Sequence, residues 1–372
     1  MKRRCRVCGG TLTEPLLSYP NMPSVAQHLP GQAELASDRG VTLRICQCLG
    51  CGLIQLDNEP VPYFREVIRA AAFSPEMRGF RREQFADWIA RHNLAGRRVL
   101  EVGCGRGEYL ELLSAVEAWG MEYGEESVNV CKAAGLRVIR DYPGEGEGPL
   151  SNHSFDGFLI LNWLEHLPDP GCALDRIGAS LTPGGVGLVE VPNFDAALCN
   201  GSFTEFTRDH LFYFTTETLT TLLNLHGFEV LSCRKIWYDY ILSAEVRKRP
   251  AMPCQGFEMS RKRLLLELDE FIGQDKVAVW GAGHQALMVL AAAGLEKKIC
   301  YVVDSATFKQ GKYTPATHLP IVSPEQLHTD PPDAVIVMAP SYCDEIAAAI
   351  RTEFGDRFRL ALLRGETLEI PR

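Results

Sequence analysis

Four cysteines near the N-terminus form two C-x-x-C pairs, Cys5 with Cys8 and Cys48 with Cys51. Each pair can form a tight turn that directs two thiolates at one ion, and two pairs complete a tetrahedral Zn²⁺ site. Four thiolate ligands leave no open position for a substrate, so the predicted zinc is structural. Cys46 is a further thiol beside the second pair, but the repeated spacing favours Cys48 as the ligand. The alternative is a set of free, reduced cysteines.

A glycine-rich turn follows an apolar strand in VLEVGCGRGEYL, with glycines at Gly103, Gly105 and Gly107. Apolar residues at helical spacing follow from Tyr109 to Val116, so the segment is typical of the first βα unit of a doubly wound sheet. Glu101 ends the strand just before the glycines. A carboxylate there repels a pyrophosphate and suits a ligand with a cationic ammonium group, such as S-adenosylmethionine.

The next predicted strand, EAWGMEYG, ends near Glu122, where a carboxylate can accept both hydroxyls of a ribose. FDGFLILNWLEHLPDP then predicts a buried strand that opens into a loop, and LTPGGVGLVEVPN predicts a turn and a further strand. In this order the segments resemble the class I S-adenosylmethionine-dependent methyltransferases from about residue 80 to 235. The resemblance implies that Asn162, Glu165 and His166 border the cofactor. The alternative is a dinucleotide-binding domain that carries an unusual glutamate.

A second glycine-rich turn lies in VWGAGHQALMVL, with Gly281 and Gly283 between a strand and a helix. The next strand ends in Asp304, so this unit taken alone matches the dinucleotide fingerprint. No Tyr-x-x-x-Lys set suited to hydride transfer accompanies it. Three interpretations remain: NAD(P) binding, binding of the nucleotide part of a substrate, or a scaffold that closes one side of the active site.

Several segments together resemble the sugar C-methyltransferases of deoxysugar and surface-polysaccharide pathways. These segments are CRVC, CLGCGLIQ, EVGCGRGEYL and the C-terminal VWGAGHQAL with D…KQG…TP. The resemblance implies an α/β protein of three domains: a zinc-ribbon-like domain at 1–68, a class I methyltransferase Rossmann-like domain at 69–238, and a Rossmann-like substrate-side domain at 239–372. It also implies chemistry on a nucleotide-linked keto-deoxysugar. A base removes a proton beside the ketone, and the enolate attacks the sulfonium methyl of S-adenosylmethionine.

The segment FTEFTRDHLFYF matches the position of a Tyr-His-Glu-His-like cluster in that family. Here the final histidine is His210, which we expect to be the general base because its ordinary pKa lies near 6.5. Asp209 could orient its ring, Arg208 could stabilise an enolate or bind a phosphate, and Tyr213 is placed beside the substrate. The family's leading tyrosine is Thr207 in this chain. The alternative for His210 is a hydrogen-bonded histidine that anchors a loop.

The resemblance favours a substrate-side or scaffolding role for the C-terminal unit. Four residues of its two loops are then candidates to contact the diphosphate or the base of a nucleotide sugar: Gly281, Gly283, Ser341 and Tyr342.

Composition limits the other possibilities. The 372 residues carry a formal net charge of −9 and no basic stripe, which argues against a nucleic-acid partner. The basic start has no apolar run behind it, and no apolar segment approaches the ~18 residues of a membrane span. We therefore expect a cytoplasmic monomer or homodimer with a small-molecule substrate. Two alternatives are an O- or N-methyltransferase of a small natural-product metabolite and a non-catalytic sugar-nucleotide-binding protein.

Overall fold

Apolar strands alternate with helical connections to build a seven-stranded sheet in the computed structural model, which describes residues 3–66 and 74–371. In spatial order its strands are β10 (Phe228–Ile236), β11 (Ile241–Lys248), β8 (Leu181–Pro192), β7 (Phe155–Leu161), β4 (Arg98–Val102), β5 (Glu117–Glu122) and β6 (Val138–Arg140). The five strands from β8 to β6 are parallel, whereas β11 runs antiparallel to both β8 and β10. This order, with one antiparallel strand inserted beside the last parallel one, is the class I methyltransferase sheet that the sequence predicts.

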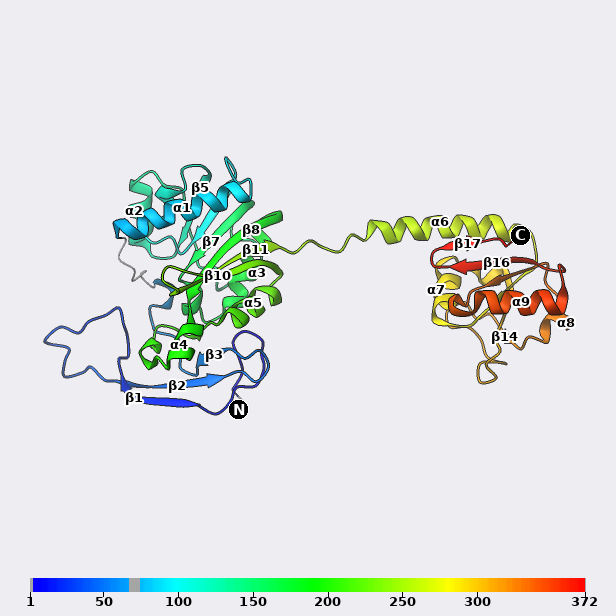
Figure 1. Cartoon of the computed structure of the whole chain (residues 1–372), viewed down its shortest axis with the longest axis horizontal. Coiled ribbons are helices and arrows are strands. Elements are labelled where there is room, and N and C mark those ends of the chain that lie inside the picture. The colour runs from blue at the N-terminus through cyan, green and yellow to red at the C-terminus, as the bar shows by residue number, and fades with distance from the viewer. Residues whose placement is uncertain (1–2, 67–73, 372) are drawn as a thin grey trace. The chain divides into compact units, whose positions relative to one another are not determined.

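Helices cover both faces of this sheet (Figure 1). The helices α1 (Pro75–Arg91) and α2 (Glu125–Ala133) lie on one face, and α3 (Pro170–Ser180) and α5 (Thr216–Leu225) lie on the other. Successive strand residues point to opposite faces, so Val99 packs toward α1 whereas Leu100 packs toward α3. Both faces are therefore buried, as parallel sheets require.

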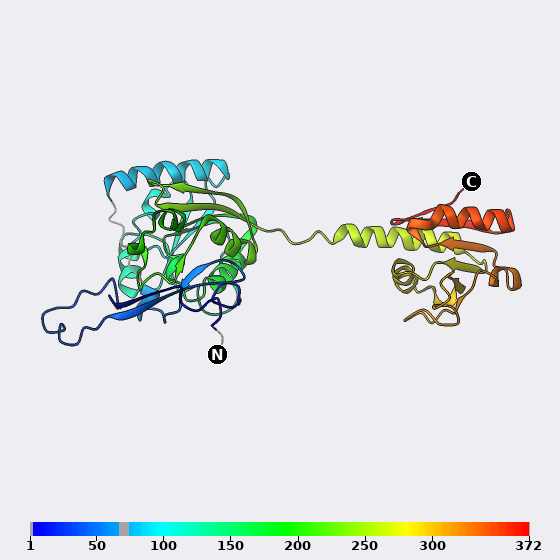
Figure 2. The same cartoon turned by 60° about the horizontal axis from the view of Figure 1, so that its bottom comes forward.

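The start of α1 is set by its own sequence. The Ser74 side chain accepts a hydrogen bond from Met77 N at 3.1 Å, and Pro75 occupies the first helical position, where no N–H is needed. Figure 2 shows this helix, in light blue, extended along the sheet of the N-terminal unit.

The predicted helix behind the first glycine loop is wrong. Only a single 3₁₀ turn, Leu110–Leu112, forms between β4 and β5. Nine residues, 108–116, separate Gly107 from β5, which begins at Glu117, and three of them form this turn. The apolar spacing marks buried positions, since Tyr109, Leu110 and Leu113 all lie in the core.

A smaller antiparallel sheet joins the cysteine-rich segment to the methyltransferase fold. It contains β1 (Leu17–Met22), β2 (Val41–Gln47), β3 (Ile54–Leu56) and β9 (Phe212–Tyr213), in that order. The last strand comes from the segment between β8 and α5, directly after His210. Short elements flank it: α4 (Phe194–Asn200) and a 3₁₀ turn at Phe203–Glu205. This pairing fixes His210 against the N-terminal segment.

The C-terminal unit has a sheet of its own, in the order β14 (Ile321–Val322), β13 (Ile299–Val303), β12 (Val277–Trp280), β15 (Ala334–Val337), β16 (Arg359–Arg364) and β17 (Thr367–Glu369). All pairs are parallel except β16 with β17. The helices α6 (Gln255–Ile272) and α7 (His284–Ala292) pack on one face, and α9 (Cys343–Phe354) packs on the other. A short helix, α8 (Gln326–Thr329), precedes β15.

The chain divides into two compact units, Met1–Pro250 and Ala251–Arg372. The boundary predicted after residue 238 is therefore too early, because β11 follows it and pairs with both β8 and β10. The boundary predicted after residue 68 lies outside the described residues. Of the helices in the described ranges, none is long and apolar enough to cross a membrane.

Candidate active site and metal centre

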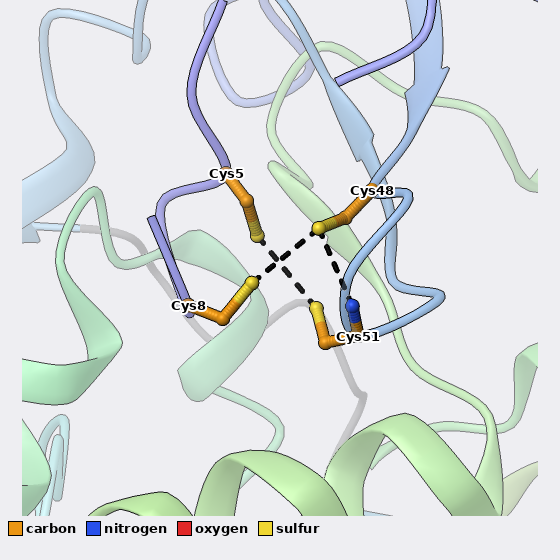
Figure 3. Close-up of side chains that lie close together, drawn as sticks. All are labelled: Cys5, Cys8, Cys48 and Cys51. Atoms are coloured by element: carbon orange, nitrogen blue, oxygen red, sulfur yellow. Dashed lines mark hydrogen bonds between the residues drawn. The ribbon is translucent and has the colours of Figure 1, made fainter. Parts of the chain in front are cut away.

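The two C-x-x-C pairs meet in space. Cys5 and Cys8 precede β1, and Cys48 and Cys51 lie in the turn between β2 and β3. Their four Sγ atoms all lie within 4.8 Å of one another, with 3.8 Å between Cys5 and Cys51 and 3.4 Å between Cys8 and Cys48 (Figure 3). Cys46 is fully buried beside this group and packs against it, as predicted, without joining it.

Backbone N–H groups point at these sulfur atoms. Gly10 N donates to Cys8 Sγ at 3.4 Å, and Gly50 N donates to Cys48 Sγ at 3.3 Å. Such donors stabilise thiolates, and four thiolates around one centre are the donor set of a structural zinc site. The residues present therefore fit Zn²⁺.

The first glycine loop begins where β4 ends. Glu101 is fully buried in the last part of that strand, and Gly103 follows with a φ of 70°. A Cβ at Gly103 would lie 3.0 Å from Cγ of Trp163, so only glycine allows this approach. Glu122, at the end of β5, accepts hydrogen bonds from Gly105 N at 2.9 Å and Tyr123 N at 2.8 Å. The predicted carboxylates of Glu101 and Glu122 thus lie at the ends of neighbouring strands, and the glycine loop is hydrogen-bonded to Glu122.

Aromatic residues that sequence analysis missed surround this loop. Tyr142 packs edge-on against Trp163, with ring centroids 6.0 Å apart, and the Arg65 guanidinium lies 5.5 Å from the Tyr142 centroid. With Gly103 and Glu122 they line a cavity of only about 10 Å³. Side chains must therefore move before a ligand enters. The signal for Tyr142 was available, since it follows β6, the next parallel strand after the one that ends in Glu122.

The end of β7 supplies the next group. Asn162 takes a positive φ of 51° and donates its backbone N–H to Glu190 O at 2.9 Å. The 3₁₀ turn Leu164–His166 then places Glu165 and His166 in the interior. This turn is joined to the His210 loop by two hydrogen bonds: Leu211 N donates to Glu165 O at 2.8 Å, and His166 Nδ1 bonds to Asp209 O at 2.9 Å.

Glu165, His166 and His210 therefore form one cluster, with ligand atoms within 4.8 Å of one another. The rings of His166 and His210 pack edge to face at 4.7 Å between centroids. Burial raises the pKa of Glu165 to about 8 and lowers the pKa of His166. Burial, reinforced by the neighbouring His166, lowers the pKa of His210 to about 3. His210 is therefore neutral at physiological pH and holds a free nitrogen lone pair.

Asp209 does not orient His210, contrary to the prediction. Its carboxylate accepts hydrogen bonds from Tyr63 Oη at 2.8 Å and from Ala26 N at 3.0 Å, so it anchors the N-terminal segment. Its backbone carbonyl binds His166 instead. Arg208 is half-buried, and its Nε and Nη1 have no hydrogen-bond partner within the described ranges. Two guanidinium nitrogens of Arg208 are therefore available to donate hydrogen bonds to a ligand near this loop.

Tyr213 is a core residue, and its predicted place beside the substrate is wrong. It is buried on β9, packs against Phe194 at 5.1 Å between ring centroids, and its hydroxyl donates to Thr207 O at 3.0 Å. The alternation of a strand turns this side chain inward, a direction that a two-residue strand does not reveal in sequence.

In the C-terminal unit, all four predicted substrate residues line one cavity of about 700 Å³: Gly281, Gly283, Ser341 and Tyr342. Gly281 has a φ of 113°, and a Cβ there would lie 2.9 Å from Met338 O, so the backbone itself requires glycine. Asp304 accepts hydrogen bonds from Ala282 N and Lys309 Nζ, both at 2.8 Å. The carboxylate of the dinucleotide fingerprint is therefore held by the glycine loop and by a lysine ammonium.

Comparison with known proteins agrees with this architecture. Residues 77–233 match the methyltransferase domain family, and residues 255–360 match the C-methyltransferase C-terminal domain family. The chain is 26% identical to C-methyltransferase NovU of Streptomyces niveus over 92% of its own length and 90% of that protein. It is an S-adenosylmethionine-dependent methyltransferase. The similarity to that C-methyltransferase extends through both units.

Other relatives match a smaller part of the chain. The ubiquinone biosynthesis O-methyltransferase of Stutzerimonas stutzeri is 30% identical over 27% of this chain, which spans 46% of that relative's length. An S-adenosylmethionine-dependent methyltransferase of known structure from Clostridium acetobutylicum covers 46% of the chain and 92% of its own, with 14% identity and a TM-score of 0.39.

Proposed function

We propose that this methyltransferase transfers the methyl group of S-adenosylmethionine to a carbon atom of a nucleotide-linked keto-deoxysugar. The observation that carries the proposal is the position of His210, a neutral histidine held beside His166 and Glu165 in the loop between β8 and β9. Similarity to NovU along 92% of the chain supports the carbon as the methylated atom.

S-Adenosylmethionine would bind at the ends of β4 and β5. Glu101 faces the cationic end of the ligand, Glu122 accepts the ribose hydroxyls, and the glycines allow close approach of the backbone. Asn162, Glu165 and His166 would border the ligand at the end of β7. When bound, the cofactor supplies an electrophilic methyl on sulfur.

His210 would remove the proton beside the sugar ketone. In the free enzyme its low pKa makes it a weak base, but the enolate that forms is an anion, and an adjacent anion stabilises the imidazolium. Arg208, whose Nε and Nη1 lack partners among the described residues, is the candidate to stabilise the enolate oxygen or a phosphate. Within the C-terminal unit, the cavity lined by Gly281 and Tyr342 is the candidate binding site for a nucleotide.

Radiolabelled S-adenosylmethionine and a panel of keto-sugar nucleoside diphosphates test the acceptor class. We expect transfer to members of the panel and none to the free sugars, which lack the nucleotide. Transfer to simple phenols instead would favour an O-methyltransferase, and absence of transfer across the panel, with cofactor binding intact in calorimetry, would contradict the acceptor class.

We also propose that Cys5, Cys8, Cys48 and Cys51 hold one structural Zn²⁺. Because one ion bound by all four thiolates would join the two loops directly, it should add to the stability of the segment. Metal analysis of the purified chain should give about one zinc per molecule for these four cysteines. Cys8→Ser should lose it, whereas Cys199→Ser, at an exposed cysteine outside the group, should retain it.

A further inference from the structure

A second group of potential metal ligands lies away from the cysteines. Glu165 and His166 come from the 3₁₀ turn after β7, and His210 comes from the loop before β9. One ligand atom from each lies within 4.8 Å of the other two. We propose that these three side chains bind a divalent transition-metal ion such as Zn²⁺ or Co²⁺, at a site distinct from the four cysteines and independent of the proposed acceptor.

The tautomer of His166 is suited to a metal. Its Nδ1 lies 2.9 Å from the backbone carbonyl of Asp209, and a carbonyl can only accept, so Nδ1 carries the proton. Nε2 is then unprotonated, and its lone pair is free to bind a metal ion. It lies 3.8 Å from Glu165 Oε1. Metal-binding histidines nearly always donate their other N–H to a carbonyl or carboxylate in this way, because that bond fixes the ring.

The Glu165 carboxyl group is buried, and one of its oxygens could bind a cation. Its side chain is 2% exposed, and its Oε2 has no hydrogen-bond partner among the described residues. A buried carboxyl group without a partner is costly, and an ion bound at this position would satisfy it. The two hydrogen bonds between the turn and the His210 loop hold the three side chains together without an ion.

The donor set selects the class of metal. Two imidazoles and one carboxylate favour Zn²⁺, Co²⁺, Fe²⁺ or Ni²⁺ over Mg²⁺ and Ca²⁺, which prefer oxygen ligands. Three protein ligands leave at least one position open to water or substrate. The ion would occupy the same His210 lone pair that accepts a proton in the proposed reaction, so metal and proton compete for it.

Co²⁺ binding to the full chain tests the site. With the cysteine site filled by Zn²⁺, added Co²⁺ should bind as a second equivalent and give d–d absorption without the intense thiolate-to-metal band. Glu165→Gln, which keeps the shape of the side chain, and His166→Ala should each weaken this binding at least about tenfold, since even indirect partners of a metal contribute about 10- to 100-fold. His153→Ala, at an exposed histidine elsewhere in the unit, is the matched control and should bind as wild type.

Two outcomes would overturn the site: no second equivalent in the wild-type chain, or a second equivalent that both variants retain although their thermal melting shows them folded. A separate assay addresses the reaction. Inhibition of methyl transfer by Co²⁺ agrees with His210 as the base, whereas binding without inhibition would count against that role while leaving the metal site in place.

Discussion

At the scale of single residues, the proposed chemistry rests on burial of polar groups beside one another. His210 lies against His166 and near Glu165, and burial keeps the imidazole neutral by lowering its pKa to about 3. A neutral imidazole is ready to take a proton without first losing one. Asp209 and Tyr63, which the sequence does not link, fix the loop that carries it.

His210→Ala should therefore lose methyl transfer while keeping the cofactor site. General-base catalysis contributes typically about 10²- to 10⁴-fold, so we expect a fall in kcat of that size. Calorimetry should show S-adenosylmethionine affinity within about twofold of wild type, since His210 lies in a separate loop from the glycine turn. A variant that retains full turnover would exclude His210 as the base.

Gly103→Ala tests the glycine loop. A side chain in left-handed backbone costs about 1–2 kcal/mol, and the new Cβ would meet Trp163 at 3.0 Å. We expect the free variant loop to relax out of this conformation, so that binding must restore it. S-Adenosylmethionine should then bind about tenfold more weakly, because about 1.4 kcal/mol is one decade in affinity. The control is Gly79→Ala in α1, where a Cβ meets nothing within 4 Å and affinity should not change.

The sequence predicts the individual site residues better than their partners. Glu101, Glu122 and the glycines are marked by their place at strand ends, which local patterns reveal. The contact between His166 and His210 depends on two loops far apart in the chain, and the inward turn of Tyr213 depends on the register of β9. Neither is encoded in a local pattern.

At the scale of elements, a buried ion pair fixes α1 on the sheet. Arg81 of α1 pairs with Glu190 of β8, and Ser243 of β11 donates to the same carboxylate at 2.9 Å. Both charged side chains are almost fully buried, at 1% and 0% exposure. The pair therefore joins a helix and two strands through one carboxylate.

Arg81→Ala should destabilise the chain by about 3–5 kcal/mol, because it leaves Glu190 as an uncompensated buried charge. Denaturant unfolding of the N-terminal unit measures the change. Arg82→Ala, at the adjacent exposed position, should stay within about 0.5 kcal/mol of wild type. Equal stability of the two variants would show that the pair carries little of the packing energy.

Strands were more predictable than connections at this scale. The segments around β4, β5, β7 and β8 were all identified from apolar runs and turn residues. The helix predicted after the first glycine loop does not form, since apolar residues at helical spacing can also be the buried positions of a segment of turns. The pairing of β9 with β3 was also missed, because a two-residue strand carries almost no sequence signal.

At the scale of the whole molecule, each of the two compact units has its own buried sheet and its own glycine-rich turn. In the C-terminal unit, the Asp304 carboxylate holds the second glycine-rich turn in place by accepting a hydrogen bond from Ala282 N. Burial alone would raise the pKa of Asp304, but hydrogen bonds from Lys309 and from the N–H groups of Ala306 and Ala282 outweigh it and hold the pKa below its usual range. This carboxylate therefore stabilises the unit when it is ionised.

The stability of the C-terminal unit should consequently depend on acid pH. A carboxyl group with a lowered pKa in the folded state contributes its full stabilisation above its unfolded pKa of about 3.9, and loses it as the pH falls through the folded value. Thermal melting of the full chain should show this loss below about pH 4, with a smaller loss in Asp304→Asn. A variant with an unchanged acid profile would show that Asp304 does not contribute.

The central claim concerns the atom that receives the methyl group. The most direct measurement is an NMR spectrum of the product formed from ¹³C-methyl S-adenosylmethionine and an accepted keto-sugar nucleotide. We predict a label bonded to a ring carbon beside the ketone, and no such signal with His210→Ala. A label on oxygen or nitrogen, in a product formed equally well by His210→Ala, would contradict the account.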